Sequence, residues 1–442
     1  MTRVALLTLG CKANQADSAM LAEALSDGPV QLVGPRDPAD ICVVNTCTVT
    51  HTADSDARQI IRQLRRTSPG AAIVVTGCYA QVAGDEVRAM PEVTHVLGNA
   101  DKARLPALLR DLAGLPPVES RRARDWAPSL RDTSQIRRLP AGRTRPFVKV
   151  QDGCDYGCSF CIIPRARGRN RSVPFEEVLD GIRRYAALGA QEVVLTGIHV
   201  GHFGRDLRPR RTLLELLRAI DAERLVPRVR ISSIEPNELR VDMLNFAAST
   251  PTVCPHFHVP LQSGSDEVLR RMRRVYTASA YVALMGAIRA RLPHAAIGID
   301  VIVGFPGETA EHFQQTVRLL RDTDFTYLHV FPYSPRAGTE AAALPDHVSP
   351  EEKRDRGDLL RALSEERRRA FTRAQVGRTV EVLVEGPAGV GRRGTSENYV
   401  QVEVAGRLSD RLVRARIVGA EGALALGVLD EPAQTGGSEC QA

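Results

Sequence analysis

The sequence predicts an α/β protein in three parts: an N-terminal α/β domain with a mostly parallel sheet, a central partial (β/α) barrel and a small C-terminal antiparallel β-barrel. Apolar strand patterns alternate with helical patterns through residues 1–115 and again from residue 147 to 335. After residue 375 short strand patterns follow one another, separated by glycine-rich turns and without a helical pattern. The length of 442 residues leaves room for two or three domains.

The N-terminal domain, residues 1–115, is predicted from apolar runs rich in β-branched residues or leucine. These strand patterns cover residues 4–9, 41–45 and 72–77. Helical spacing fills the intervals at residues 16–25 and 54–66. Strands that alternate with helices favour a parallel sheet, whose ligand-binding loops follow the carboxyl ends of the strands.

A cysteine follows each of these three strands: Cys11, Cys47 and Cys78. Because the strand ends of a parallel sheet share one edge, the three side chains can converge there although they are about 30 residues apart in sequence. Three buried structural cysteines are the alternative, since free cysteine is usually buried. Their positions in Gly, Thr and Asn turns favour a ligand set, whereas Cys42, inside a strand, fits the core.

Residues 116–146 are predicted to be a linker, because prolines bracket them and hydrophobic periodicity is lost. Eight arginines accompany only three acidic residues in this stretch. It is either a solvated, flexible linker or an arginine-rich ribbon that follows an RNA backbone, where each phosphate contact makes affinity fall with salt.

The central domain is predicted to span residues 147–374 and opens with a cysteine-rich loop at 147–168. The loop holds Cys154, Cys158 and Cys161 in a C-x-x-x-C-x-x-C spacing. Three thiolates from one short loop can bind three irons of a 4Fe–4S cluster and leave the fourth iron without a protein thiolate. A zinc site would need a fourth Cys or His, and none lies within twenty residues on either side.

Repeated β–α units of about 30 residues predict a parallel barrel or an open partial barrel, with function at the C-terminal ends of the strands. The strand patterns occur at residues 147–151, 192–197, 229–234, 256–261, 297–305 and 327–334. The helical patterns include residues 174–188, 213–222, 278–292 and a long charged stretch at 350–374. His199, His256 and His258 could be ligands or proton donors, and we expect packed or hydrogen-bonded histidines instead.

Four arginines lie beside the three cysteines, at the end of the cysteine-rich loop and just after it: Arg165, Arg167, Arg169 and Arg171. The run is either a solvated charged surface or, with a nucleic-acid substrate, the group that grips phosphate nearest the chemistry. The net charge of +7 favours an anionic partner such as nucleic acid.

A small barrel is predicted at residues 375–431, followed by a disordered tail at 432–442. Its expected strands cover residues 378–385, 396–404, 411–419 and 423–429. Arg392, Arg393 and Tyr399 are placed where a sheet face could contact phosphate and stack on a base, with core packing as the alternative for Tyr399.

The chain contains no run of eighteen apolar residues, and its N-terminal apolar stretch is too short for a signal peptide. Nine cysteines are too few for a disulfide scaffold, and in a cytosolic enzyme they suit metal or catalytic ligands. We therefore expect a cytoplasmic protein without membrane association that works as a monomer.

The motifs LGCK-NQ-DS, VNTCTVT and TGCYAQ, followed by the C-x-x-x-C-x-x-C loop with Phe160, resemble the methylthiotransferase family of radical S-adenosylmethionine (SAM) enzymes. The resemblance covers nearly the whole chain and includes GRRGTSENYVQV, which is similar to the RNA-binding TRAM domain. It implies two 4Fe–4S clusters, an auxiliary cluster on the strand-end cysteines and a radical-generating cluster on the loop cysteines. It also implies that the amino and carboxylate groups of SAM occupy the open iron of the radical cluster.

The resemblance further implies which regions contact SAM. The region of Gly197 would meet the methionine end, and the regions of Ser233 and Gln262 would lie near methionine or ribose. The turn at 304–307, which begins with Gly304, would lie near adenine, and Phe160 belongs to the cluster loop itself.

The activity implied by the resemblance is methylthiolation of carbon 2 of N6-threonylcarbamoyladenosine at tRNA position 37, in the anticodon loop, because TGIHVGHFG and VNTCTVT resemble that branch. A deoxyadenosyl radical would remove the hydrogen from carbon 2, and an electron donor such as flavodoxin or ferredoxin would reduce the clusters. Alternatives are the branches that modify isopentenyladenosine-37 or an aspartate of a ribosomal protein, and a non-catalytic iron–sulfur RNA-binding protein.

Overall fold

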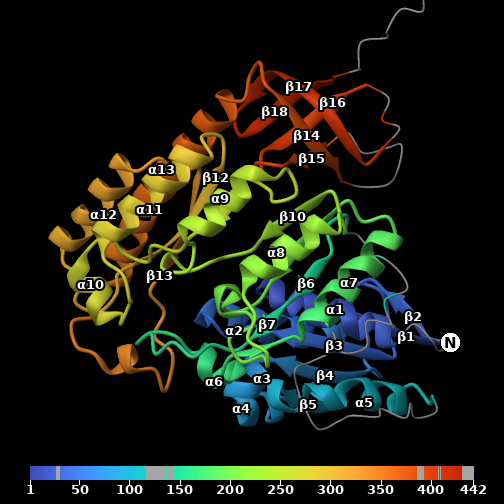
Figure 1. The fold of residues 1–442 in the computed structure, drawn as a ribbon. Helices are drawn as coiled ribbons and strands as arrows, with labels where there is room; N and C mark the ends of the chain where they lie inside the picture. Colours follow the sequence, from blue (N-terminus) through green and yellow to red (C-terminus); the bar gives the residue numbers. More distant parts are fainter. Residues whose placement is uncertain are drawn as a thin grey trace, which may run out of the picture.

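The computed structural model describes residues 1–25, 30–115, 136, 139, 143–385, 393–406, 408 and 410–430. Figure 1 shows the N-terminal domain in blue and the C-terminal barrel in red, with the green-to-orange central domain touching both. The predicted fold class is confirmed in all three parts. No helix in this described part of the chain combines the length and the apolarity that a membrane span needs.

The N-terminal domain is a five-stranded parallel sheet in the order β2-β1-β3-β4-β5. Its strands are β1 Thr2–Thr8, β2 Val30–Val33, β3 Ile41–Thr46, β4 Ala72–Gly77 and β5 His95–Gly98. Its helices are α1 Lys12–Ala24, α2 His51–Thr67, α3 Cys78–Val82, α4 Gly84–Arg88, α5 Leu105–Leu112 and the 3-10 turn η1 Asn99–Arg104. The apolar runs of the sequence predicted the three central strands β1, β3 and β4. They did not predict the two four-residue edge strands β2 and β5, whose residues are only half-buried or exposed.

Alternate residues of the central strands enter two separate hydrophobic clusters, one on each face of the sheet. On one face Cys42 and Val44 pack with Ile61 of α2. On the other face Val43 packs with Leu21 of α1 and with α5. Because both faces are covered by helices, β3 is fully buried, which explains its continuous apolar sequence.

The central domain is a partial barrel made of two three-stranded parallel sheets, β10-β9-β6 and β11-β12-β13. Isolated bridges Val229–Val253 and Ser233–His258 join the two sheets. The strands are β6 Phe147–Lys149, β9 Glu192–Thr196, β10 Arg228–Ile231, β11 His256–His258, β12 Ala296–Val303 and β13 Tyr327–Pro332, with a small pair β7 Gln151–Asp152 and β8 Arg171–Ser172. The helices are α6 Ile163–Arg167, α7 Phe175–Ala187, η3 Val200–His202, α8 Leu213–Ala222, α9 Val241–Ser249, α10 Asp266–Arg271, α11 Ala278–Arg291, α12 Ala310–Asp322 and η4 Glu340–Ala343.

The long helix α13, Pro350–Arg373, packs on β13 and leads into the C-terminal barrel. The barrel closes in the order β14-β15-β16-β18-β17. Its strands are β14 Thr379–Val384, β15 Arg393–Ser396, β16 Gln401–Ala405, β17 Leu412–Glu421 and β18 Leu424–Leu429. The stretch expected as one strand at 396–404 begins at the end of β15, turns at 397–400 and continues as β16. The β16–β18 pair is parallel, while the other pairs of the barrel are antiparallel.

Two buried arginines of β10 hold the C-terminal barrel against the central domain. Arg228 donates to the carbonyl oxygen of Glu381 at 2.8 Å, and Arg230 donates to that of Glu397 at 3.0 Å. Both guanidinium groups also pair with the carboxylate of Glu192, which is fully buried. Burial opposes the charge of Glu192, yet Arg230 and Arg228 lower its pKa to about 2.

Candidate active site

The three strand-end cysteines meet at the carboxyl edge of the N-terminal sheet. Cys11 caps α1 after β1, Cys47 follows β3, and Cys78 begins α3 directly after β4. Gly10 has φ +87, and a Cβ there would lie 2.7 Å from the sulfur of Cys47. Only glycine therefore allows the β1 turn to come this close to Cys47.

The electrostatics of this triplet show that its thiols are neighbours. Burial, together with the neighbouring thiols of Cys78 and Cys11, raises the pKa of Cys47 to about 11. Cys47 and Cys78 are buried, whereas Cys11 is exposed. The structure thus brings together three cysteines that are far apart in sequence, with one open side at Cys11.

The loop cysteines Cys154, Cys158 and Cys161 form a second group at the mouth of the partial barrel. Burial raises the pKa of Cys161 to about 12, and the thiols of Cys158 and Cys154 add to the effect. Cys158 lies 3.3 Å from Nη1 of Arg274, and Cys154 lies 3.3 Å from Nδ1 of His199. Two positively polarised groups therefore contact this triplet, as suits thiolates that carry negative charge.

The spacing of the sulfur atoms distinguishes a cluster from a single ion. Within the described residues, the groups of potential ligand atoms that all lie within 4.8 Å of one another are His199–His202–Glu238 and His258–Asp300–His329, and neither cysteine triplet is among them. Three thiolates on one zinc, at about 2.3 Å from the metal, would lie closer together than that. Wider spacing fits thiolates that each bind a different iron of a 4Fe–4S cluster. Cysteine thiolates are the ligands of such clusters, and each triplet supplies three of them.

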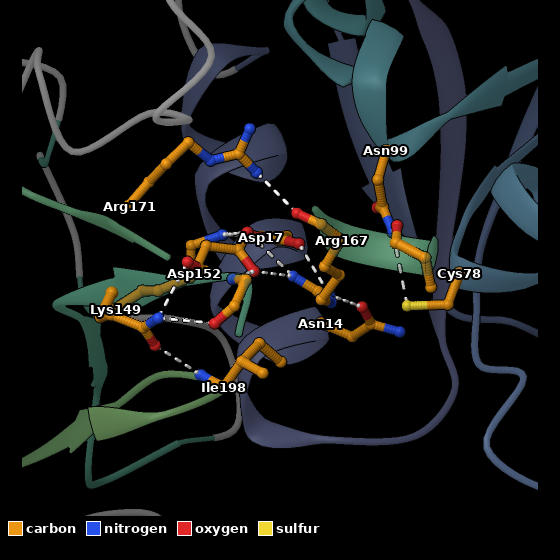
Figure 2. Close-up of polar contacts among 12 residues, drawn as sticks. Asn14, Asp17, Cys78, Asn99, Lys149, Asp152, Arg167, Arg171 and Ile198 are labelled. Carbon is orange, nitrogen blue, oxygen red and sulfur yellow. Dashed lines mark hydrogen bonds and ion pairs between the residues drawn. The ribbon is translucent and has the colours of Figure 1, made fainter. Parts of the chain in front are cut away.

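A buried ionic network joins the two domains between the triplets (Figure 2). Asp17 of α1 accepts hydrogen bonds from Lys102 at 2.7 Å and from Lys149 of β6 at 2.5 Å. Arg167, the last residue of α6, lies 3.4 Å from Asp17 and pairs with Asp152 at 2.9 Å. Burial opposes ionisation of Asp17, yet its cationic neighbours hold its pKa well below the usual range.

The position of Arg167 corrects the prediction that it binds RNA. Its side chain is fully buried, and its guanidinium is occupied by Asp152, Asp17 and the amide oxygen of Asn14. Burial opposes the charge of Arg167, yet Asp152, the thiol of Cys78, Asp17 and the thiol of Cys11 raise its pKa, so its charge also faces the auxiliary triplet. Arg167 therefore holds the two domains together beside the clusters rather than contacting phosphate.

Two further contacts tie the auxiliary triplet to the central domain. Asn99 donates to the sulfur of Cys78 at 3.4 Å and to the carbonyl oxygen of Ala166 at 2.8 Å. On the other side, Arg336, beyond β13, donates to Thr48 and Asp54 at 2.6 Å each, beside Cys47. Sequence reasoning missed these partners, because Asn99 and Arg336 stand outside the cysteine motifs.

A cavity of about 230 Å³ lies between the two domains beside the radical-cluster loop. Its walls combine residues of the N-terminal domain with Phe160, Cys161, Gln262 and Asp300 of the central domain. Val49 and Thr50, from the VNTCTVT motif, form the N-terminal wall. Two of the five predicted SAM contacts, Phe160 and Gln262, thus line the same cavity as a cluster cysteine.

The other three predicted SAM contacts lie outside the lining of this cavity. Gly197 packs against Gln151, whose side-chain oxygen would lie 2.8 Å from an added Cβ, and Ser233 is exposed beside its bridge to His258. Gly304 is buried under the Lys353 side chain of α13, and Glu308 accepts its N–H at 2.6 Å. Gly304 therefore packs against α13, and its expected place near adenine stays a prediction.

The remaining residues predicted to bind RNA differ in exposure. Arg165 and Arg169 are exposed, whereas Arg171 is half-buried and donates to the carbonyl oxygen of Arg167. Arg393 is exposed and pairs with Glu403 at 2.8 Å. Arg392 lies outside the described residues, as do most of the linker 116–146 and the tail.

Tyr399 corrects a second prediction, because it does not lie on a sheet face. It occupies the turn between β15 and β16 with φ +68, and its ring stacks on His256 at 4.1 Å. His256 also bonds Tyr327, and His258 bonds Asp300 at 2.7 Å. The histidines are therefore packed and hydrogen-bonded, as expected.

Comparison with known proteins covers most of the chain. Residues 3–98 match the family described as "Uncharacterized protein family UPF0004", and residues 148–320 match the radical SAM superfamily. The threonylcarbamoyladenosine tRNA methylthiotransferase MtaB of Bacillus subtilis is 37% identical over 87% of this chain and 85% of the relative. The chain belongs to the radical SAM methylthiotransferase family. Members of the radical SAM superfamily use a 4Fe–4S cluster and SAM, and methylthiotransferases of this kind carry two clusters.

Other methylthiotransferases are similar to most of the chain, and a solved structure shares its fold. The enzyme with the same name from Aquifex aeolicus is 36% identical over 94% of this chain and its full length. The tRNA-2-methylthio-N(6)-dimethylallyladenosine synthase of Acidothermus cellulolyticus is 38% identical over 92% of this chain and 82% of that protein. The solved radical SAM methyltransferase TsrM of Kitasatospora setae, with tryptophan and a SAM analogue bound, shares the fold with a TM-score of 0.53 and 18% identity, covering 77% of this chain and 75% of that one.

Proposed function

We propose that this methylthiotransferase adds a methylthio group to carbon 2 of N6-threonylcarbamoyladenosine at tRNA position 37. The observation that carries the proposal is a cavity walled by both domains, with Val49 and Thr50 of the VNTCTVT motif on one side and Cys161 of the cysteine loop on the other. Relatives named for this nucleoside match nearly the whole chain. Because an aromatic C–H bond is unactivated, its hydrogen must be removed by a radical. The radical-generating cluster and the auxiliary cluster must therefore face the same substrate.

The residues of the cavity are proposed to position SAM against the radical cluster. Cys154, Cys158 and Cys161 would hold the cluster, and the ring of Phe160 with the amide of Gln262 would orient the cofactor. When bound, the reduced cluster and SAM supply a carbon-centred radical able to take hydrogen from carbon 2. The apolar walls exclude water, which protects such a reactive species from side reactions.

The RNA contacts are proposed from exposed cations near the cluster loop. Arg165 and Arg169 are exposed beside the loop, and Arg393 lies on the barrel, where each can contact a phosphate. An anticodon loop offers an unpaired base, which is the usual target of sequence-specific RNA recognition. We infer a cytoplasmic enzyme that works as a monomer with flavodoxin or ferredoxin as electron donor.

The competing nucleoside is N6-dimethylallyladenosine, because a synthase of its 2-methylthio derivative is as similar to this chain as the threonylcarbamoyl enzymes are. Mass spectrometry of tRNA nucleosides from a deletion strain decides between them. We expect the methylthio group to disappear from threonylcarbamoyladenosine alone and to return on complementation. Loss from the dimethylallyl nucleoside instead would overturn the proposed substrate, and absence of 5′-deoxyadenosine after anaerobic incubation with SAM and dithionite would overturn the radical reaction.

A further inference from the structure

A second cavity of about 230 Å³ opens where all three parts of the chain meet. Its wall includes Lys12 of the N-terminal domain, Arg230 of the central domain and Tyr399 of the C-terminal barrel, together with Arg143 and Arg145. Four of its lining residues are therefore cations. Glu385 is the single carboxylate residue in the described lining of this cavity, and it pairs with Arg145 at 2.6 Å.

Two of the four cations lack a carboxylate partner in the described part of the chain. Arg230 and Arg145 are paired with Glu192 and Glu385, respectively. Within the described residues no hydrogen bond or ion pair reaches Nζ of Lys12, and Arg143 rests its guanidinium on the ring of Phe147, 4.8 Å from the centroid. A half-buried ammonium and an exposed guanidinium that line one cavity without a carboxylate partner can together bind an anion.

The electrostatic surroundings of Lys12 support this reading. Lys12 lines the cavity together with the guanidinium groups of Arg230 and Arg145. Like charges around one cavity repel one another, and an anion between them would relieve that repulsion. The planar guanidinium of Arg143 is suited to bind a carboxylate or a phosphate through two parallel hydrogen bonds.

The cavity is close to the proposed active site. Lys12 directly follows the auxiliary-cluster cysteine Cys11, and the carboxylate of Asp300, which lines the cavity beside the radical-cluster loop, acts on the charge of Lys12. The N6 atom and carbon 2 of adenine lie on the same edge of the ring, separated by N1. A base that presents carbon 2 between the clusters therefore carries its N6 substituent nearby.

We propose that the cavity lined by Lys12, Arg143, Arg145 and Arg230 binds the carboxylate of the amino-acid substituent on N6 of the target adenosine. This inference rests on the proposed function and makes the cavity its specificity determinant. A dimethylallyl group carries no charge and would leave Lys12 and Arg143 without a partner, whereas a threonylcarbamoyl group ends in a carboxylate. A backbone phosphate of the RNA offers the same anionic chemistry, and the experiment separates the two sources.

The test compares the binding of three synthetic anticodon stem-loops to anaerobically reconstituted full-length enzyme, measured by fluorescence anisotropy. The target adenosine carries the threonylcarbamoyl group, the same group with its carboxylate converted to a neutral amide, or no substituent. We expect the acid to bind roughly 10- to 100-fold more tightly than the amide, as is usual for a hydrogen-bonded charged group. The variants Arg143→Gln and Lys12→Met should each lose this preference while binding the amide stem-loop as the wild type does.

Arg318→Gln, on the exposed face of α12 and paired with Glu311, is the control and should keep the preference. Because Lys12 adjoins Cys11, the iron content of Lys12→Met is measured in parallel to show that its cluster is intact. Arg143→Gln tests the cavity at a position away from the cluster loop. Equal binding of acid and amide by the wild type would overturn the inference. So would variants that weaken all three stem-loops alike, because that result assigns the cavity to a backbone phosphate. Methylthiolation of the acid stem-loop by the wild type is measured separately, so that failure of the cavity proposal leaves the proposed function distinguishable.

Discussion

Replacement of Asp17 by asparagine is expected to lower the free energy of unfolding by about 3–5 kcal/mol, the cost typical of removing one partner from a buried ion pair. The side chain of Asp17 is 2% exposed and accepts from Lys102 at 2.7 Å and Lys149 at 2.5 Å, with Arg167 at 3.4 Å. Asparagine keeps the size of the side chain but removes its charge. Lys149 and Arg167 would keep Asp152 as their carboxylate, whereas Lys102 would keep only the amide oxygens of Asn45 and Asn99.

The loss would act between domains, because Lys149 and Arg167 belong to the central domain and Asp17 to the N-terminal one. Urea unfolding followed by circular dichroism under anaerobic conditions measures it, with Asp111→Asn, an exposed position on α5, as the control expected within about 0.5 kcal/mol of the wild type. We also expect Asp17→Asn to cleave SAM without transferring the methylthio group, since the two clusters lose their fixed relation. A loss below about 1 kcal/mol, or one matched by the control, would refute the role assigned to the network.

Glu192 has a pKa of about 2 against a usual 4.5, so its stabilising effect is complete above pH 4.5 and is lost as the pH falls toward 2. The unfolding free energies of wild type and Glu192→Gln should therefore differ by about 3 kcal/mol at pH 7, and the difference should become smaller below pH 4.5. A difference that does not change with pH would contradict the stabilising role of the ionised Glu192. The double variant Arg165→Gln/Arg169→Gln should lower the slope of log affinity for tRNA against log salt by about 1.4, and an unchanged slope would show that neither residue contacts phosphate. Cys11→Ala should retain about four irons and still cleave SAM. Cys158→Ala should also retain about four irons but should not cleave SAM. Loss of all iron from either variant would contradict two independent clusters.

The strands and the cysteine groups could be predicted because their signals are local. The β-branched runs of β3 and β4 end in turns that carry cysteine, and the parallel sheet then brings those turns together. The role of Arg167 could not be predicted in this way. Its partner Asp17 lies 150 positions away, and the alternating run of arginines around it looks like a surface. Which arginine of such a run turns inward depends on where another domain supplies a carboxylate.

Tyr399 shows a second limit of pattern reading. The alternation of residues 396–404 is compatible with one continuous strand, but the chain turns at 397–400 so that the ring can reach His256 in another domain. Interdomain packing thus overrode a local pattern, and the positive φ of Tyr399 marks the place. The edge strands β2 and β5 were missed for the opposite reason, since short, half-exposed strands carry too little apolar sequence to stand out.

Residues 163–167 cover Cys78, and this cover decides from which side the auxiliary triplet can be reached. The N-terminal domain leaves the ribosome first, with its cysteine edge open to solvent. Once α6 docks, Cys47 and Cys78 are only 8% and 3% exposed, and Cys11 is the remaining point of entry. In the folded chain the auxiliary triplet is therefore reached from the side where Cys11 stands.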